Sequence, residues 1–217
     1  MSCEIEREEP KGAKKMELSG ATMKALLGRS TASLADVTKH LGETPHERRI
    51  AECVELGKAE QARLWEIAEG KGEPLTLDYL VHPNAKPLIA FPFEGKNSLP
   101  AFTRFQKVFY RQEDGVIGGM NRQTLSPITG PGYYVAEMSA LNPAEIGVNY
   151  LKVPSQKPAG WPAIQKNEEG ANLSRFIYAN MIDYLRWVSK DVVIGRAYRA
   201  GTKPMPNWFI LCRAVER

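Results

Sequence analysis

The chain has 217 residues, of which 43% are hydrophobic, so it can build a substantial core without disulfides. Its three cysteines lie far apart without CxxC spacing, which argues against a disulfide framework and a zinc site and favours the cytoplasm. No run approaches the ~20 apolar residues that span a bilayer, so a transmembrane helix is not expected. The net charge of +4 is uneven, with −3 up to Ala85 and +7 after it, so the second half would attract anionic ligands.

The first third of the chain predicts a tail followed by a small helical region. Residues 1–17 are charged, poor in aromatic residues and without the apolar stretch of a secretory signal, so we expect a disordered tail. Residues 18–73 carry short helical patterns with recognisable ends. The expected helices are Thr22 to Leu27, Ser33 to Leu41 with Asp36 in a capping box, a third one capped by Thr44 with Glu47 and ending at Gly57, and Lys58 to about Ala68. We expect them to form a compact cap.

Residues 74–217 predict an antiparallel β-barrel-like domain, so the fold class is α+β. Apolar runs rich in β-branched and aromatic residues alternate with Gly, Pro, Asn or Asp, which is typical of strands joined by turns. The eight expected strands are Lys86–Phe93, Phe102–Tyr110, Val116–Gln123, Gly132–Met138, Ile146–Val153, Ser174–Tyr178, Val192–Tyr198 and Trp208–Cys212. The proline-rich stretch from Pro154 to Gly170 predicts a lid or packed loop across one barrel end, and Asn180 to Ser189 predicts a turn or two of helix.

No motif for catalysis, metal binding or phosphate binding accompanies this pattern. Gly130-Pro131-Gly132 precedes a strand and its proline has no N–H to offer a phosphate, so it predicts a turn. The histidines His40, His46 and His82 have no metal-ligand spacing, and their absence from the β half argues against a proximal haem ligand or a Ser-His-Asp triad there. We therefore expect no metal and no cofactor. Gly118-Gly119 predicts a bulge or tight bend in its strand.

Two cations embedded in apolar strands are candidates for an inward orientation. Alternation places Lys107 on one face with Phe105 and Phe109, and it places Arg196 with the larger apolar residues of its own strand. A buried cation requires a partner, and the common outcome is a snorkelling side chain or a buried ion pair with Glu94, Glu137 or Asp183. The functional interpretation is an anion or carboxylate bound inside the barrel.

Tyrosines and neighbouring polar residues complete the candidate site. Because Tyr133 and Tyr134 are consecutive, one hydroxyl should reach the interior, where it could orient a ligand or act as a general acid near Asp183. A buried tyrosine bonded to backbone is the more common outcome. The candidate ligand-binding residues are Lys107, Asn121, Tyr133, Tyr150, Asp183 and Arg196. No residue can be assigned as catalytic from the sequence.

Several stretches carry a family resemblance, namely Gly95–Phe102, Thr129–Tyr134, Gly160-Trp161-Pro162 and Ile194–Tyr198. In them the chain resembles a group of uncharacterised bacterial proteins of about this length, which implies a bacterial source and no particular chemistry. The C-terminal part is also similar to lipocalin-like GXWXG-domain proteins, in the order Asp183–Val188, Val193-Ile194-Gly195 and Trp208–Leu211. The stretch nearest to the Gly-x-Trp-x-Gly motif, Val116-Ile117-Gly118-Gly119, lacks the tryptophan, so no functional residue is carried over.

Three functions fit these features. The first is binding of a small apolar or anionic molecule in the barrel interior, with little or no catalysis. The second is a metal-independent isomerase, cyclase or lyase in the same cavity, with Asp183 and a tyrosine as acid and base. The third, a protein or nucleic-acid contact through the basic β face, ranks last because the interleaved aromatic and basic pattern of a single-strand binder is missing. No membrane partner is expected, and the sequence gives no oligomeric state.

Overall fold

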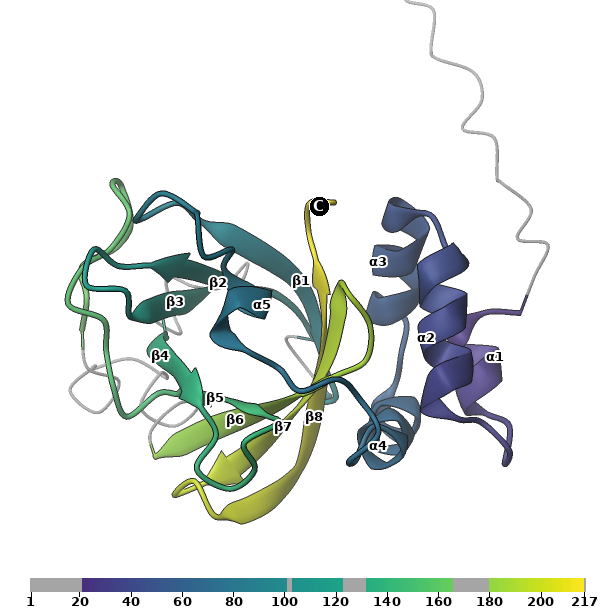
Figure 1. Cartoon of the computed structure of the whole chain (residues 1–217). Helices are drawn as coiled ribbons and strands as arrows, with labels where there is room; N and C mark the ends of the chain where they lie inside the picture. Colours follow the sequence, from purple (N-terminus) through teal and green to yellow (C-terminus); the bar gives the residue numbers. More distant parts are fainter. Residues whose placement is uncertain (1–20, 101–102, 123–131, 166–179, 217) are drawn as a thin grey trace, which may run out of the picture.

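In the computed structural model the second half of the chain closes into an eight-stranded antiparallel barrel (Figure 1). The structure describes residues 21–100, 103–122, 132–165 and 180–216. Each strand pairs with the next, and β8 returns to pair with β1, so the sheet is closed. The strands are β1 (Phe91–Asn97), β2 (Arg104–Arg111), β3 (Ile117–Arg122), β4 (Tyr133–Met138), β5 (Ile146–Asn149), β6 (Met181–Trp187), β7 (Val192–Arg199) and β8 (Lys203–Arg213).

Alternation along the strands separates an inner from an outer layer of side chains. Phe109, Leu185 and Leu211 belong to a core cluster on the inner face of the barrel, whereas Ile194 and Ile210 belong to a second cluster outside it. Strands β7 and β8 are therefore buried on both faces. This explains why their sequences are nearly continuous apolar runs rather than alternating ones.

Four helices form a layer against the outer wall of the barrel (Figure 1), α1 (Met23–Leu27), α2 (Leu34–Glu43), α3 (His46–Val54) and α4 (Lys58–Ile67). Helices α3 and α4 lie on β8 and its two neighbours, where Leu64 packs with Val192 and Ile210. The side chain of Thr22 caps α1, and Ser33 and Asp36 form the expected capping box of α2. The helical cap thus covers the side of the barrel. Among the described helices, none is long and apolar enough to cross a membrane.

A short helix, α5 (Leu77–Leu80), lies at the barrel end where the even-numbered strands finish (Figure 1). Leu80 and Val81 are fully buried and belong to the inner cluster together with Phe93. The ring of Tyr79 stacks on Phe93 with 6.5 Å between centroids. This end of the barrel is therefore filled by apolar side chains.

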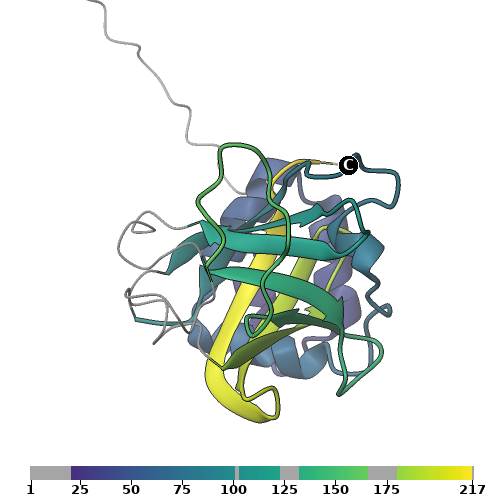
Figure 2. The same ribbon diagram turned by 90° about the vertical axis from the view of Figure 1, so that its left-hand side faces the viewer.

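The chain that follows β5 crosses the outer face of β2, β3 and β4 (Figure 2). Tyr110 donates a hydrogen bond to the carbonyl of Gln156 at 2.6 Å, and Tyr133 donates one to the carbonyl of Pro162 at 2.7 Å. Gln112 accepts from the backbone of Ser155 at 2.8 Å. The described part of the loop expected to cross a barrel end therefore packs on the wall instead, because tyrosines on the outer face supply its hydrogen bonds.

Several expectations about local structure need correction, among them the fifth strand, which ends at Asn149 instead of Val153, and the last strand, which begins at Lys203 instead of Trp208. The segment 180–189 forms β6 and not a helix: its outer face lies under the helical layer and its inner face lines the barrel, so both faces carry apolar residues and the alternation is hidden. The first strand begins at Phe91 instead of Lys86. Thr44 ends α2 and bonds the carbonyl of His40, so it does not cap α3. The strand expected at 174–178 and the tail at 1–17 lie outside the described residues.

Candidate functional site

Four polar side chains meet inside the barrel, toward the end where the odd-numbered strands finish. Lys107 on β2 lies opposite Asn121 on β3, Asp183 is on β6, and Tyr150 directly follows β5. The alternation that turns Phe109 inward on β2 also turns Lys107 inward. The most exposed members of this set are only 4% exposed. We call Lys107, Asn121, Tyr150 and Asp183 the barrel quartet.

Hydrogen bonds connect every member of the barrel quartet. Lys107 Nζ donates to the hydroxyl of Tyr150 at 2.6 Å and to Oδ2 of Asp183 at 3.1 Å. Asn121 Nδ2 donates to the same hydroxyl at 2.8 Å, and that hydroxyl lies 3.2 Å from Oδ2 of Asp183, to which it donates. Within the described residues, the buried Oδ1 of Asn121 has no hydrogen-bond partner. A buried polar atom without a partner is uncommon, and it marks a place where a ligand group could donate a hydrogen bond.

Aromatic rings surround the ammonium group of Lys107. Its Nζ lies 4.8 Å from the ring centroid of Tyr134, 5.0 Å from that of Tyr150, 5.1 Å from that of Phe209 and 5.9 Å from that of Phe105. Ring faces carry negative potential and attract a cation, most strongly where water is absent. The cation is therefore held by both a carboxylate and an aromatic enclosure.

Inward-facing glycines make room for three of these rings. The cross-strand pairs are Gly95 with Phe105, Gly119 with Tyr134 and Gly195 with Phe209. A Cβ atom at Gly119 or Gly195 would overlap the opposite ring. Strand pairing runs through Gly118-Gly119 without a change of register, so of the bulge and the tight bend expected there the bulge is wrong. Gly119 permits close approach of a ring.

Burial and charge act in opposite directions on Lys107, which is 1% exposed. Desolvation lowers the pKa of Lys107 below its ordinary value, and the charge of Asp183 offsets this only in part. An ammonium beside a carboxylate and an amine beside a carboxylic acid have the same net charge, so burial favours moving a proton within the pair. The barrel quartet can therefore hold a polar ligand group, relay a proton through Tyr150 or present an amine.

Arg196 does not join the barrel quartet, and its expected inward orientation is wrong. It lies on the outer face of β7 with Ile194, where its Nε donates to the carbonyl of Met205 at 2.9 Å and its guanidinium lies 5.1 Å from the ring centroid of Trp208. The helical layer makes this outer face apolar. Alternation therefore identified the neighbours of Arg196 on the face but not which face is inside.

Tyr133 also points away from the barrel interior. Its hydroxyl donates to the carbonyl of Pro162, and burial raises its pKa to about 12 despite the nearby charge of Arg122. The tyrosine that reaches the interior is Tyr134, whose hydroxyl donates to the carbonyl of Val108 at 3.0 Å. The sequence predicted that one of the two tyrosine rings lies inside the barrel, but the candidate chosen from it, Tyr133, was the wrong one. Phe209 was not predicted as a site residue. Gly195 on the facing strand could have indicated it, because a glycine leaves room for a large ring opposite.

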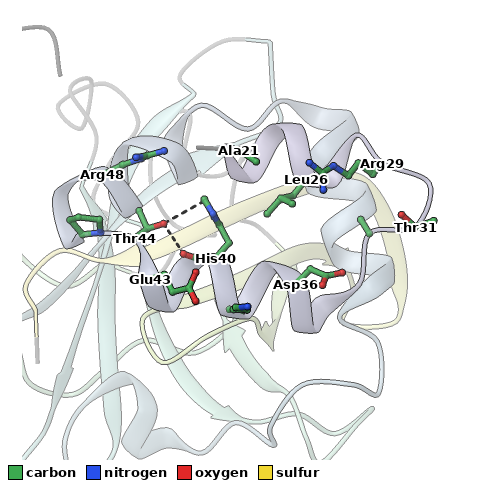
Figure 3. A pocket seen from close by; sticks show the side chains of 12 residues that line it. Ala21, Leu26, Arg29, Thr31, Asp36, His40, Glu43, Thr44 and Arg48 are labelled. Carbon is green, nitrogen blue, oxygen red and sulfur yellow. Dashed lines mark hydrogen bonds between the residues drawn. The ribbon is translucent and has the colours of Figure 1, made fainter. Parts of the chain in front are cut away.

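A separate cleft of about 490 Å³ lies in the helical layer, between α1, α2 and α3 (Figure 3). In Figure 3, His40 and Thr44 lie toward the same end as Arg48, and Arg29 lies at the other. The imidazole of His40 and the guanidinium of Arg48 both bind the carboxylate of Glu52, at 2.6 and 2.8 Å. Burial acts to raise the pKa of Glu52, but these hydrogen bonds and one from a backbone N–H outweigh it and lower that pKa. The side chains of His40 and Arg48, at this end of the cleft, are thus already bonded to Glu52.

No group of three His, Cys, Asp or Glu side chains in the described ranges is placed to hold a metal ion. Comparison with protein-family models, with curated proteins and with solved structures gives no match. The barrel quartet is therefore the feature from which a function can be inferred.

Proposed function

We propose that this chain is a small-molecule-binding protein whose ligand reaches the barrel at the end that carries the barrel quartet. The observation that supports this most strongly is the buried Lys107, bonded to Asp183 and Tyr150 inside an aromatic enclosure. The strands that carry these residues are already joined by the closed ladder of backbone hydrogen bonds. Burying a charge pair there costs stability without connecting separate elements, which is typical of functional sites.

The chemistry of the enclosure favours a ligand with an apolar body and one polar or anionic group. Rings of Phe105, Tyr134 and Phe209 offer apolar contact. The Lys107 ammonium can donate a hydrogen bond to the polar group, and Oδ1 of Asn121, which has no partner among the described residues, can accept one. Apolar walls with few convergent polar groups are what small-molecule sites in barrels generally provide.

The opposite end is a poor route into the barrel. There α5 places the fully buried Leu80 and Val81 against Phe93. At the end of the barrel quartet, Asn121 and Asp183 each keep 4% exposure, and Tyr150 keeps 3%. Phe105 and Met181 lie nearer to this end of their strands than Lys107 and Asp183 do, so a ligand that approaches from this side meets apolar and polar groups together.

The proposal includes a reducing, cytoplasmic location for the protein. Cys53 and Cys212 are free thiols in the core. Buried free thiols persist where glutathione and thioredoxin keep cysteines reduced. The ligand is then an intracellular molecule.

Native mass spectrometry of the purified full chain, first under gentle and then under denaturing conditions, tests the proposal. We expect the wild type to retain a co-purifying or added apolar carboxylic acid. The amount bound to Lys107→Met should be at least about tenfold lower, because this substitution removes the charged partner of the ligand. Arg196→Met, a cation on the outer face, is the matched control and should retain the ligand. Circular dichroism of Lys107→Met verifies folding. If both variants bind as the wild type does, the site is elsewhere and the proposal fails.

A second candidate, a metal-independent acid–base enzyme, is favoured by one observation. The hydroxyl of Tyr150 touches Lys107, Asp183 and Asn121 at once, which is the arrangement of a proton relay. Turnover would appear as a released molecule whose mass or retention differs from that of the ligand supplied. Tyr150→Phe should then bind the ligand and release it unchanged, and an unchanged ligand from the wild type would leave binding as the function.

A further inference from the structure

The amine of Lys107 is the least expected group in the core. Among the described lysines it is the only one that is buried. Its Nζ has two hydrogen-bond acceptors, Tyr150 and Asp183, and no third acceptor within the described residues. In a neutral amine the electron pair takes the position of the third hydrogen of the ammonium group. One direction from Nζ therefore carries no hydrogen bond to any described residue, and rings border it.

We propose that Lys107 binds an apolar aldehyde or ketone covalently, as an imine, inside the barrel. The inference rests on the proposed function, because it names the chemical class of the ligand for the same site. A lysine desolvated among apolar side chains is the usual setting for amine nucleophiles that attack carbonyl carbons. The barrel quartet supplies the other groups that this chemistry needs.

The first requirement is a neutral amine, which Asp183 can generate. Its Oδ2 lies 3.1 Å from Nζ, so the ammonium can pass a proton directly to the carboxylate. The pair has no net charge before or after this transfer, and burial favours the neutral form. Consistent with this, desolvation lowers the pKa of Lys107.

The bond-forming steps then balance within the barrel quartet. The electron pair of Nζ forms a bond to the carbonyl carbon, the carbonyl π pair moves to oxygen, and the hydroxyl of Tyr150, 2.6 Å from Nζ, relays a proton from nitrogen to that oxygen. The proton held by Asp183 then passes to the resulting hydroxyl, the carbon–oxygen bond breaks and water leaves as the nitrogen pair forms the C=N bond. Ammonium and carbonyl thus become iminium and water, and the carboxylate again faces a cation.

The environment also suits the intermediate and the product. Oδ1 of Asn121, which has no hydrogen-bond partner in the part of the chain that the structure describes, can accept a hydrogen bond from the hydroxyl of the carbinolamine. The rings of Tyr134 and Phe209 surround the position of the iminium, which they stabilise as they stabilise the ammonium. The same rings limit access of water, which would hydrolyse the imine.

Borohydride trapping on the full wild-type chain tests the proposal without any variant. The protein is incubated in turn with hexanal, benzaldehyde and cinnamaldehyde, reduced with sodium borohydride, digested and mapped by mass spectrometry. We expect a reduced adduct on Lys107 that exceeds the adduct on Lys190, whose side chain is 64% exposed, by at least about tenfold for one of the three probes. The preference should disappear in urea. Labelling confined to exposed lysines with all three probes would overturn the proposal.

Two controls separate this inference from the proposed function. Lys107→Arg keeps the positive charge but cannot form an imine, so it should lose the specific adduct and keep the general labelling of the surface. Cinnamate, the carboxylate counterpart of cinnamaldehyde, is measured by native mass spectrometry. If cinnamate binds while no aldehyde labels Lys107, the imine is refuted and ligand binding remains. If neither probe engages the barrel, both proposals fail.

Discussion

Two buried ion pairs differ in what they connect. Arg49 on α3 binds the carboxylate of Asp191 in the turn between β6 and β7, and it also donates to the carbonyl of Leu41 at 2.8 Å and to that of Thr44 at 2.9 Å. One guanidinium thus joins the end of α2, helix α3 and the barrel. These three hydrogen bonds hold separate elements together, so this pair is structural.

The pair of Lys107 and Asp183 joins strands that the closed sheet already holds. It leaves an amide oxygen of Asn121 without a partner among the described residues, and it fills the barrel with polar atoms where apolar side chains would pack. The difference teaches that burial of a charge does not by itself indicate function. The useful question is whether removal of the pair would disconnect parts of the fold.

Breaking the structural pair should have the largest effect. Asp191→Ala leaves the buried guanidinium of Arg49 without its counter-ion, and we expect a loss at the upper end of about 3–5 kcal/mol in the free energy of unfolding. Urea denaturation measures it. Glu69→Ala removes a partner of Arg186 that is 71% exposed and should change stability by less than about 1 kcal/mol. Equal effects of the two substitutions would remove the distinction.

The second-largest effect should come from replacing both members of a pair, which distinguishes the Lys107–Asp183 pair from the Arg49–Asp191 pair. Asp183→Leu alone should destabilise the protein by roughly 3 kcal/mol, because it leaves the Lys107 ammonium buried and unpaired. The double variant Lys107→Met/Asp183→Leu should return to within about 1 kcal/mol of the wild type or exceed it, since apolar groups then fill the barrel. Arg49→Met/Asp191→Leu should show no such recovery, because two backbone carbonyls lose their donors. Urea denaturation of all these variants measures their free energies of unfolding. Recovery of stability in both double variants would contradict the expected difference between the two pairs.

A methyl group added to the wall of the barrel should have a smaller effect. Gly195→Ala places a Cβ against the ring of Phe209, which encloses Lys107, and overpacking of this kind typically costs about 1–3 kcal/mol. In the helical layer, Gly42 in α2 faces open space, so Gly42→Ala should stabilise the protein by about 0.5–1 kcal/mol. Thermal melting of both variants should show a lower melting temperature for Gly195→Ala and a higher one for Gly42→Ala than for the wild type. A stabilising Gly195→Ala would show that the rings have room to move.

The smallest expected effect is a dependence of stability on pH. The unfolded lysine titrates near 10.5, whereas burial lowers the pKa of Lys107 in the folded state. Between these two values the unfolded chain binds more protons, so stability rises with pH and the cost of the buried charge disappears at the alkaline limit. The difference in unfolding free energy between the wild type and Lys107→Met should therefore increase in favour of the wild type as pH rises toward 10.5. A flat or falling profile would contradict the expectation.

Local patterns predicted the fold class and the inward orientation of Lys107, because alternation with Phe105 and Phe109 is a property of one strand. They named Asn121, Tyr150 and Asp183 as candidate residues beside Lys107, but they could not show which of them contact it. Tyr150 and Asp183 lie 43 and 76 residues further along the chain, and only the register of the closed sheet places them together. The sequence also could not predict on which side of the sheet Arg196 lies. A helical layer makes the outer face of β7 apolar, and the sequence of the strand alone does not reveal that layer.

The seam between β1 and β8 also has a consequence for the time course of folding. Phe93 to Asn97 pair with Phe209 to Arg213, and the same β8 is the surface on which α3 and α4 rest. The sheet cannot close, and the surface that contacts α3 and α4 cannot form, until β1 and β8, which lie more than a hundred residues apart in the sequence, have paired. Loop closure of this length slows folding, and sheets dominated by distant contacts reach the native state in about milliseconds to seconds. The helices and the barrel should therefore appear together, in one late kinetic phase.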